Sequence, residues 1–107
     1  MDKKELINQY KSRVQIGGVY AIKNMTLNKW YVDATSDLAA AENRFKFFGS
    51  THMKVEQDHK AQNGEGFVFE VLEELKKNES QTGREFKDDL VVLKDIWLEK
   101  LSGRELY

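Results

Sequence analysis

The chain contains no cysteine among its 107 residues, which excludes disulfide bonds, thiolate metal sites and cysteine nucleophiles together. It also contains no proline, an absence that excludes little by itself. No apolar run approaches the roughly 18 residues that a membrane-spanning helix needs. The opening segment MDKKELINQY lacks the apolar stretch of a signal peptide. The sequence therefore predicts a cytosolic (cytoplasmic) protein that does not associate with membranes.

A strong excess of either charge is also lacking, because the net charge is only −1. Residues 1–60 hold ten Lys and Arg against seven Asp and Glu, whereas residues 61–107 hold seven against eleven. Dedicated nucleic-acid binders usually carry a marked basic excess, because neutralising phosphates supplies most of their non-specific affinity. We therefore expect any binding of DNA or RNA to be weak, and the acidic C-terminal half leaves a basic protein partner as another possibility.

The chain is rich enough in apolar residues to build one core. Hydrophobic residues make up 40% and aromatic residues 11% of the sequence, which is typical of a packed globular protein. A length of 107 residues suits a single domain. We therefore expect one domain that covers residues 1–107.

Apolar periodicity and turn residues divide this domain into helices and strands. The predicted helices cover residues 2–13, the segment from Thr35-Ser36-Asp37 to Gly49, about 53–62, and 85–101. The predicted strands cover residues 18–23, 29–34 and 67–75, and residues 76–85 are predicted to form an exposed loop. The first two strands would form an antiparallel hairpin, which is unstable alone and needs the third strand. The expected fold is α/β in the wide sense (α+β), with a small three-stranded, mainly antiparallel sheet flanked by helices.

Three segments of the chain resemble the GIY-YIG endonuclease family. Gly18-Val19-Tyr20 is followed eleven residues later by Tyr31-Val32-Asp33 and then ATSDL, which is similar to the two tripeptides and the helix start of that family. NGEGFVFEVLEEL looks like its third strand, and LVVLKDIWLEK looks like the helix that carries its metal-binding glutamate. The resemblance spans about 85 residues, from Gly17 to Leu101. It implies a GIY-YIG-like domain preceded by the N-terminal helix.

The resemblance also implies a phosphodiesterase chemistry, and most of its residues are replaced here. In the family a tyrosine helps to activate water, an arginine contacts the phosphate and a glutamate binds Mg²⁺ or Mn²⁺, roles that suit phosphodiester hydrolysis. Tyr20 and Tyr31 match the tyrosines. Where the family has a glycine, an arginine and a glutamate, this chain has Asp33, Ala41 and Lys94, respectively. A histidine that is frequent in the family is replaced by Phe45. Because an ammonium cannot bind Mg²⁺, the central requirement of the site is missing.

Two nearby residues are possible substitutes. Arg44 lies about 60° around a helix from Ala41, so its long side chain is within reach of a phosphate. Asp95 lies about 100° from Lys94 and is expected to point away from the site. The vestigial candidates are therefore Tyr20, Tyr31 and Arg44, with no metal site. The leading hypothesis is a catalytically inactive nuclease-like domain, a pseudoenzyme that binds a partner or serves a structural role without a cofactor.

The alternatives depend on basic residues and on metal. Lys23, Lys29, Arg44 and Lys46 are candidates for a shallow nucleic-acid-binding face of a non-catalytic protein. A weak endonuclease that reuses Arg44 and Asp95 would need Mg²⁺, and it is the enzymatic alternative. His52 and His59 lie two helical turns apart if both are helical, which is too far for one ion. The sequence does not predict an oligomeric state.

Overall fold

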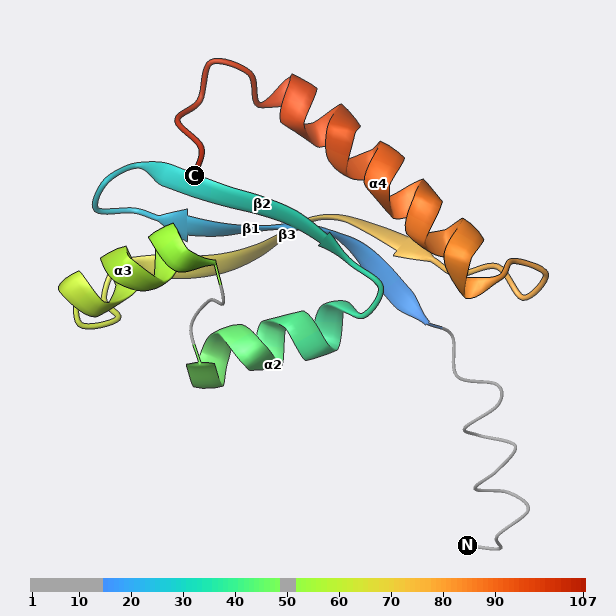
Figure 1. Ribbon diagram of the computed structural model, residues 1–107, viewed down its shortest axis with the longest axis horizontal. Helices are drawn as coiled ribbons and strands as arrows, with labels where there is room; N and C mark the ends of the chain where they lie inside the picture. Colours follow the sequence, from blue (N-terminus) through green and yellow to red (C-terminus); the bar gives the residue numbers. More distant parts are fainter. Residues whose placement is uncertain (1–14, 49–51) are drawn as a thin grey trace, which may run out of the picture.

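The computed structural model describes residues 15–48 and 52–107. Its elements, in chain order, are β1 (Ile16–Asn24), β2 (Lys29–Thr35), α2 (Leu38–Phe48), α3 (Met53–Ala61), β3 (Phe67–Lys76) and α4 (Gly83–Lys100) (Figure 1). The predicted helix over residues 2–13 lies outside the described residues. The expected α+β class is confirmed, as is the three-stranded sheet.

The sheet has the order β2-β1-β3, and both pairings are antiparallel. Asparagines shape the turn between β1 and β2: the Asn24 Oδ1 accepts hydrogen bonds from the backbone N–H groups of Thr26 and Leu27, at 3.1 and 3.2 Å. Asn28 ends the turn in the left-handed region, with φ of 53°. This is a conformation that asparagine tolerates well. The hairpin predicted from the sequence is thereby confirmed.

Gly18, the first residue of the Gly-Val-Tyr tripeptide, has a structural role of its own. A Cβ atom at this position would lie 2.1 Å from the carbonyl oxygen of Glu73 on β3. The strands approach closely because the register of β1 and β3 shifts between Val19 and Tyr20, at a β-bulge. Strand packing alone therefore explains this glycine, without any reference to catalysis.

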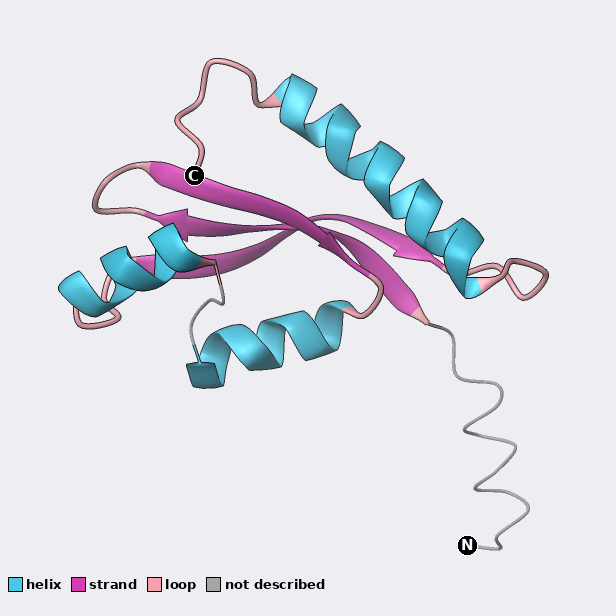
Figure 2. Cartoon of the chain, in the orientation of Figure 1, coloured by secondary structure: helices cyan, strands magenta, loops and turns pink. Residues whose placement is uncertain are grey.

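The helices form a layer on each side of the sheet (Figure 2). Helix α4 lies along one side, and α2 and α3 lie on the other. The core under α4 centres on Val19, Ala21 and Val32, with Trp30 and Trp97 packed against it. Burial of these apolar side chains is the main force that holds α4 on the sheet. No helix in the described ranges is long and apolar enough to cross a membrane.

Helix α4 begins earlier than its apolar pattern predicts. Thr82 is its N-cap, and its side chain accepts the Glu85 N–H at 3.1 Å while the Glu85 carboxylate accepts the Thr82 N–H at 3.2 Å. This reciprocal capping box satisfies two backbone donors, so the helix starts at Gly83. The predicted loop over residues 76–85 is therefore wrong at both ends, since β3 also extends through Lys76.

Candidate functional site

Tyr20 and Tyr31 lie on the same side of the sheet, the side that α2 and α3 cover. Tyr20 pairs with Asp33 across the hairpin, and Ile22 pairs with Tyr31, so these side chains share one face. Trp30 points to the opposite side and packs in the core under α4. The two tyrosines that resemble family motif residues are thus brought together with Asp33.

Asp33 is the centre of a small polar cluster. The Tyr31 hydroxyl donates a hydrogen bond to its Oδ2 at 2.9 Å, and the Ala34 N–H donates to its Oδ1 at 2.8 Å. The Lys94 ammonium, from α4, reaches the same Oδ1 at 3.2 Å. Because β2 is an edge strand, the Lys94 side chain can pass the edge of the sheet from the α4 side and contact Asp33. We call Tyr31, Asp33 and Lys94 the Asp33 cluster.

The Asp33 cluster joins two positions at which the chain departs from the family pattern. The resemblance predicts a glycine at position 33 and a glutamate at position 94, and the Asp33 and Lys94 side chains found there form an ion pair. Their exposed fractions are 33% and 35%, so the pair is partly shielded from water. A carboxylate that is already paired with an ammonium is a poor ligand for a divalent cation.

The environment of the tyrosines favours their protonated forms. Burial raises the pKa of Tyr20 to about 12, the negative charge of Asp33 adds to this effect, and Arg44 opposes it. Burial also raises the pKa of Tyr31, and the hydrogen bond to Asp33 and its charge raise it further. With a pKa near 12, only about 10⁻⁵ of Tyr20 is ionised at pH 7. Neither phenol is therefore prepared to take a proton from water at neutral pH.

The α2 side of the site is aromatic, with Phe45 at the position where the resemblance predicts a histidine. The Phe45 ring lies 5.7 Å from the Phe69 ring, which in turn stacks on Tyr20 at 4.9 Å with an interplanar angle of 22°. Ala41 is buried against the sheet at 6% exposure. Arg44 is exposed, and its charge acts on Tyr20. Arg44 is therefore the cation of α2 that lies within electrostatic reach of the tyrosines.

The candidate metal ligands do not converge. Asp95 is exposed, whereas its neighbour Lys94 turns toward Asp33. His52 is the N-cap of α3 rather than part of the helix, and its ring lies 4.7 Å from Tyr31, whereas the His59 ring lies 5.2 Å from Phe67. The described part of the chain contains no group of three or more His, Cys, Asp or Glu side chains able to hold a metal ion.

The four basic residues proposed as one nucleic-acid-binding face are separated. Lys23 lies on the α4 side of the sheet, paired with Glu70 and 4.0 Å from the centre of the Trp30 ring. Lys29 lies 5.2 Å from the Tyr107 ring centre. Lys46 pairs with Glu42 on α2 at 3.4 Å, and Arg44 lies on the same helix. Lys23 therefore lies on the opposite side of the sheet from α2, because alternate residues of β1 face opposite sides.

The C-terminal residue takes part in a buried network that the sequence did not predict. The fully buried Asn24 donates hydrogen bonds to the Tyr107 hydroxyl at 2.8 Å and to Gln62 at 2.7 Å. The Tyr107 hydroxyl donates to Asp58 of α3 at 2.7 Å. Because the Tyr107 N–H also bonds to the Trp30 carbonyl at 2.8 Å, the C-terminus covers part of the β2 edge. The sequence signal was a single terminal aromatic residue, which is too little to predict these contacts.

Taken together, the face around Tyr20 offers phenols, an exposed guanidinium and an ion pair. These groups can form hydrogen bonds with a ligand, and the phenols are protonated donors. Comparison of the chain with protein-family models, with curated proteins and with solved structures finds no match.

Proposed function

We propose that this chain is a non-catalytic domain of the GIY-YIG-like type, and that it serves as a binding or structural module. The observation that carries the proposal is the Asp33–Lys94 ion pair, whose atoms lie 3.2 Å apart. In the family that the chain resembles, these positions hold a glycine and a metal-binding glutamate. Here an ammonium replaces the metal ligand, and a carboxylate accepts its hydrogen bond.

Three properties of this site work against phosphodiester hydrolysis. Lys94 stands on α4 where the resemblance places a cation-binding carboxylate, so developing charge on a phosphate would lack a metal held there to stabilise it. The Asp33 carboxylate would repel a phosphate that approaches Tyr31. Burial raises the pKa of Tyr20 to about 12, which leaves it a hydrogen-bond donor at neutral pH. Each property by itself lowers the rate, and together they remove the acid–base and metal steps.

The arrangement of elements supports the resemblance. The two tripeptides lie on paired strands of one hairpin, and a helix follows the second strand. Lys94, at the position of the glutamate, points from the last helix to the second tripeptide. The resemblance implies that position 94 of the last helix lies close to the second tripeptide. The contact between Lys94 of α4 and Asp33 of β2 agrees with this.

The first experiment is a cleavage assay on the unaltered protein. Labelled single- and double-stranded DNA and RNA are incubated with the protein and Mg²⁺ or Mn²⁺, and we expect no cleavage above a protein-free control. Cleavage that needs the metal and disappears in Tyr20→Phe would refute the proposal and favour the alternative of a weak endonuclease. In that case Arg44→Gln would test whether Arg44 is the phosphate contact.

A second experiment restores the metal ligand. In the variant Asp33→Gly with Lys94→Glu, a carboxylate replaces the ammonium and its former partner is removed, so Mn²⁺ should raise the melting temperature by ligand linkage. Asp33→Gly with Lys87→Glu is the matched control, since it makes the same charge changes but places the new carboxylate at a different, exposed position of α4. An equal metal effect in both variants, or in neither, would count against the assignment of Lys94 to the glutamate position. Ala41→Arg is added last, because Ala41 is buried and an arginine there costs stability.

A further inference from the structure

The side of α4 that faces away from the sheet carries exposed apolar side chains. Val91, Val92 and Ile96 have exposed fractions of 57%, 59% and 43%. They lie within about 140° of the helix circumference, because successive residues of a helix are about 100° apart. Phe86 and Leu90, on the inward side, are buried in the core. The three exposed residues therefore form a second apolar strip on the same helix.

Carboxylates accompany this strip. Asp88, Asp95 and Glu99 are exposed, and on the helix they fall between Val91 and Val92 in angle. Within residues 15–48 and 52–107, none of these three carboxylates forms an ion pair with a Lys or Arg side chain. We call the three carboxylates, together with the three exposed apolar residues, the outer face of α4. An apolar strip accompanied by negative charge suits an occupant that is both apolar and basic.

Residues 2–13 of this chain, which lie outside the described residues, have that composition. Their sequence predicts a helix with Leu6, Ile7 and Tyr10 on one face. They hold four Lys and Arg against two Asp and Glu, a net charge of +2, and in a helical projection Lys3 falls among the apolar residues. A single helix of about 12 residues is marginal in water, so this segment needs a surface on which to pack.

The described chain begins beside the first turn of α4. Gln15 lines a hollow of about 470 Å³ together with Arg84 at the start of that helix. A Cβ atom on Gly17 would lie 2.9 Å from the Phe86 ring, so β1 and α4 are in close contact here. Figure 1 shows the start of β1 close to the start of α4. A helix that leads into Gln15 and packs along α4 must therefore run antiparallel to it.

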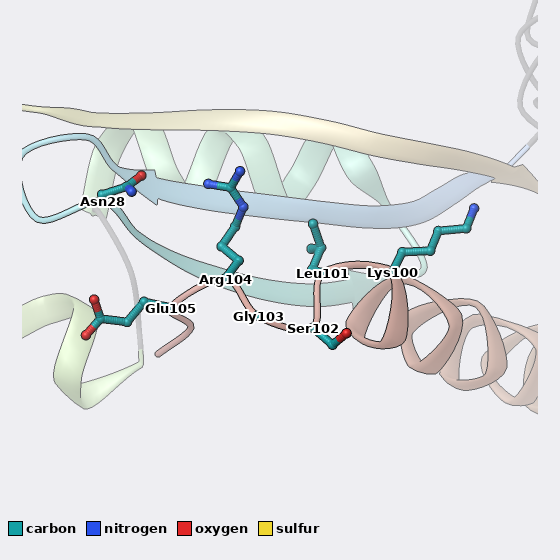
Figure 3. A pocket seen from close by; sticks show the side chains of 7 residues that line it. All are labelled: Asn28, Lys100, Leu101, Ser102, Gly103, Arg104 and Glu105. Carbon is teal, nitrogen blue, oxygen red and sulfur yellow. The ribbon is translucent and has the colours of Figure 1, made fainter.

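The other end of α4 does not suit a basic segment. The cavity of about 590 Å³ at that end is lined by Lys100 and Arg104 among other residues (Figure 3). Their head groups are directed apart on either side of Leu101. Positive charge on both sides of a single apolar residue would repel a basic segment. The outer face of α4 is the better match in charge.

We propose that residues 2–13 pack antiparallel against the outer face of α4 of the same chain. In the register that places Leu6 opposite Ile96, Tyr10 lies opposite Val92. Apolar contact between these side chains supplies most of the stabilisation, because their area is removed from water. The inference is independent of the proposed loss of catalysis, since it uses none of the residues of the Asp33 cluster.

The same register also matches the charges and the lengths of the two helices. Lys3 comes opposite Glu99, and Arg13 comes to the turn of α4 that carries Asp88. A helix of 12 residues is about 18 Å long, and the stretch of α4 from Asp88 to Glu99 spans about 17 Å. Exposed ion pairs contribute little energy each, so their main effect is to select this register and orientation.

Disulfide cross-linking tests the proposal directly, because the chain has no cysteine of its own. Tyr10→Cys with Val92→Cys places two thiols where the proposed register brings them together. The matched control combines Tyr10→Cys with Asn43→Cys, an exposed position of α2 on the other side of the sheet. In the full-length protein under mild oxidation, we expect the Val92 pair to lose its free thiols about tenfold faster than the control pair. The rate should not depend on protein concentration, and the product should migrate as a monomer on a non-reducing gel.

Equal rates of oxidation in the two pairs overturn the proposal. A cross-linked dimer as the main product overturns it as well, because the occupant of the outer face would then be a second copy. Should the variant with Val92→Cys lose its circular dichroism spectrum, Leu6→Cys with Ile96→Cys takes its place one turn along the register, with the same criteria.

A charge-reversal cycle tests the register. Glu99→Lys and Lys3→Glu should each slow the cross-linking severalfold, and the two together should restore it, because the ion pair is then re-formed with its charges exchanged. Glu79→Lys makes the same charge change in the exposed loop before α4 and should leave the rate unchanged. An unchanged rate in Glu99→Lys, or an equal effect of Glu79→Lys, overturns the proposed register.

Discussion

The Asp33–Lys94 ion pair should couple β2 to α4 energetically. A double-mutant cycle measures this coupling, with Asp33→Asn removing the negative charge at constant shape and Lys94→Met removing the ammonium while it keeps the apolar stem. Asp33 also accepts hydrogen bonds from Tyr31 and Ala34, so its substitution should cost more than that of Lys94. The cycle isolates the pair from these other contacts.

The expected coupling follows from the distance and the exposure of the pair. Opposite charges 3.2 Å apart attract each other by about 1 kcal/mol in a water-like dielectric and about 5 kcal/mol at an effective dielectric near 20. Desolvation and side-chain entropy offset much of this attraction, and each side chain is one-third exposed. We therefore expect a coupling of about 1 kcal/mol, with Asp33→Asn alone destabilising the fold by about 1–2 kcal/mol.

Urea unfolding followed by circular dichroism gives the four free energies, and the chain supplies its own control pair. Glu42 and Lys46 are four residues apart on α2, 3.4 Å from each other, with exposed fractions of 46% and 62%. Their coupling should not exceed about 0.5 kcal/mol, and about 0.5 M salt should screen it more fully than the coupling of Asp33 with Lys94. A coupling of zero between Asp33 and Lys94, or one no larger than that of the control pair, would refute the view that this ion pair organises the site.

Three further predictions concern single residues. Burial raises the pKa of Tyr20 to about 12 in the folded state, compared with 10 in the unfolded chain. The contribution of the neutral phenol to stability is therefore complete below pH 10 and is lost as the pH rises through 12. When the free energy of unfolding in urea is measured at increasing pH, it should fall less steeply in Tyr20→Phe than in the unaltered protein. Asp33→Asn should lower the pKa of Tyr31, since a nearby negative charge is removed, and ultraviolet titration of the phenols measures this shift. Tyr107→Phe removes one hydrogen bond to Asp58 and one from Asn24, so it should destabilise the fold by about 1–3 kcal/mol and speed amide exchange in β2.

The sequence predicted the strands better than the helix ends. The runs in β1, β2 and β3 combine β-branched and aromatic residues with turn residues at their borders, and these local signals agree with the sheet. The start of α4 was missed because residues 80–85 contain no large apolar side chain, so apolar periodicity gives no signal there. The information lay instead in Thr82 and Glu85, whose spacing is that of a capping box.

In the candidate site, the sequence predicted contacts between residues of one hairpin but not contacts between segments that are distant in the chain. Tyr20 and Tyr31 share a face because the hairpin register follows from a short turn, and this could be inferred. The contacts of Asp58 with Tyr107 and of Arg104 with Trp30 join segments that are distant in sequence. Such contacts depend on how the C-terminal segment crosses the edge of the sheet, which no local pattern specifies.

The Asp33–Lys94 contact links two positions that the proposed resemblance treats separately. Under that proposal, an aspartate at the glycine position and a lysine at the glutamate position would count as two independent losses. The structure brings them within 3.2 Å of each other across 61 residues of sequence, and their charges are opposite. With glycine at position 33, Lys94 would lose its carboxylate partner. With glutamate at position 94, Asp33 would face a like charge, which is destabilising at close range. The two residues are therefore favourable only as a pair, so the stability of each single variant should depend on the residue at the other position.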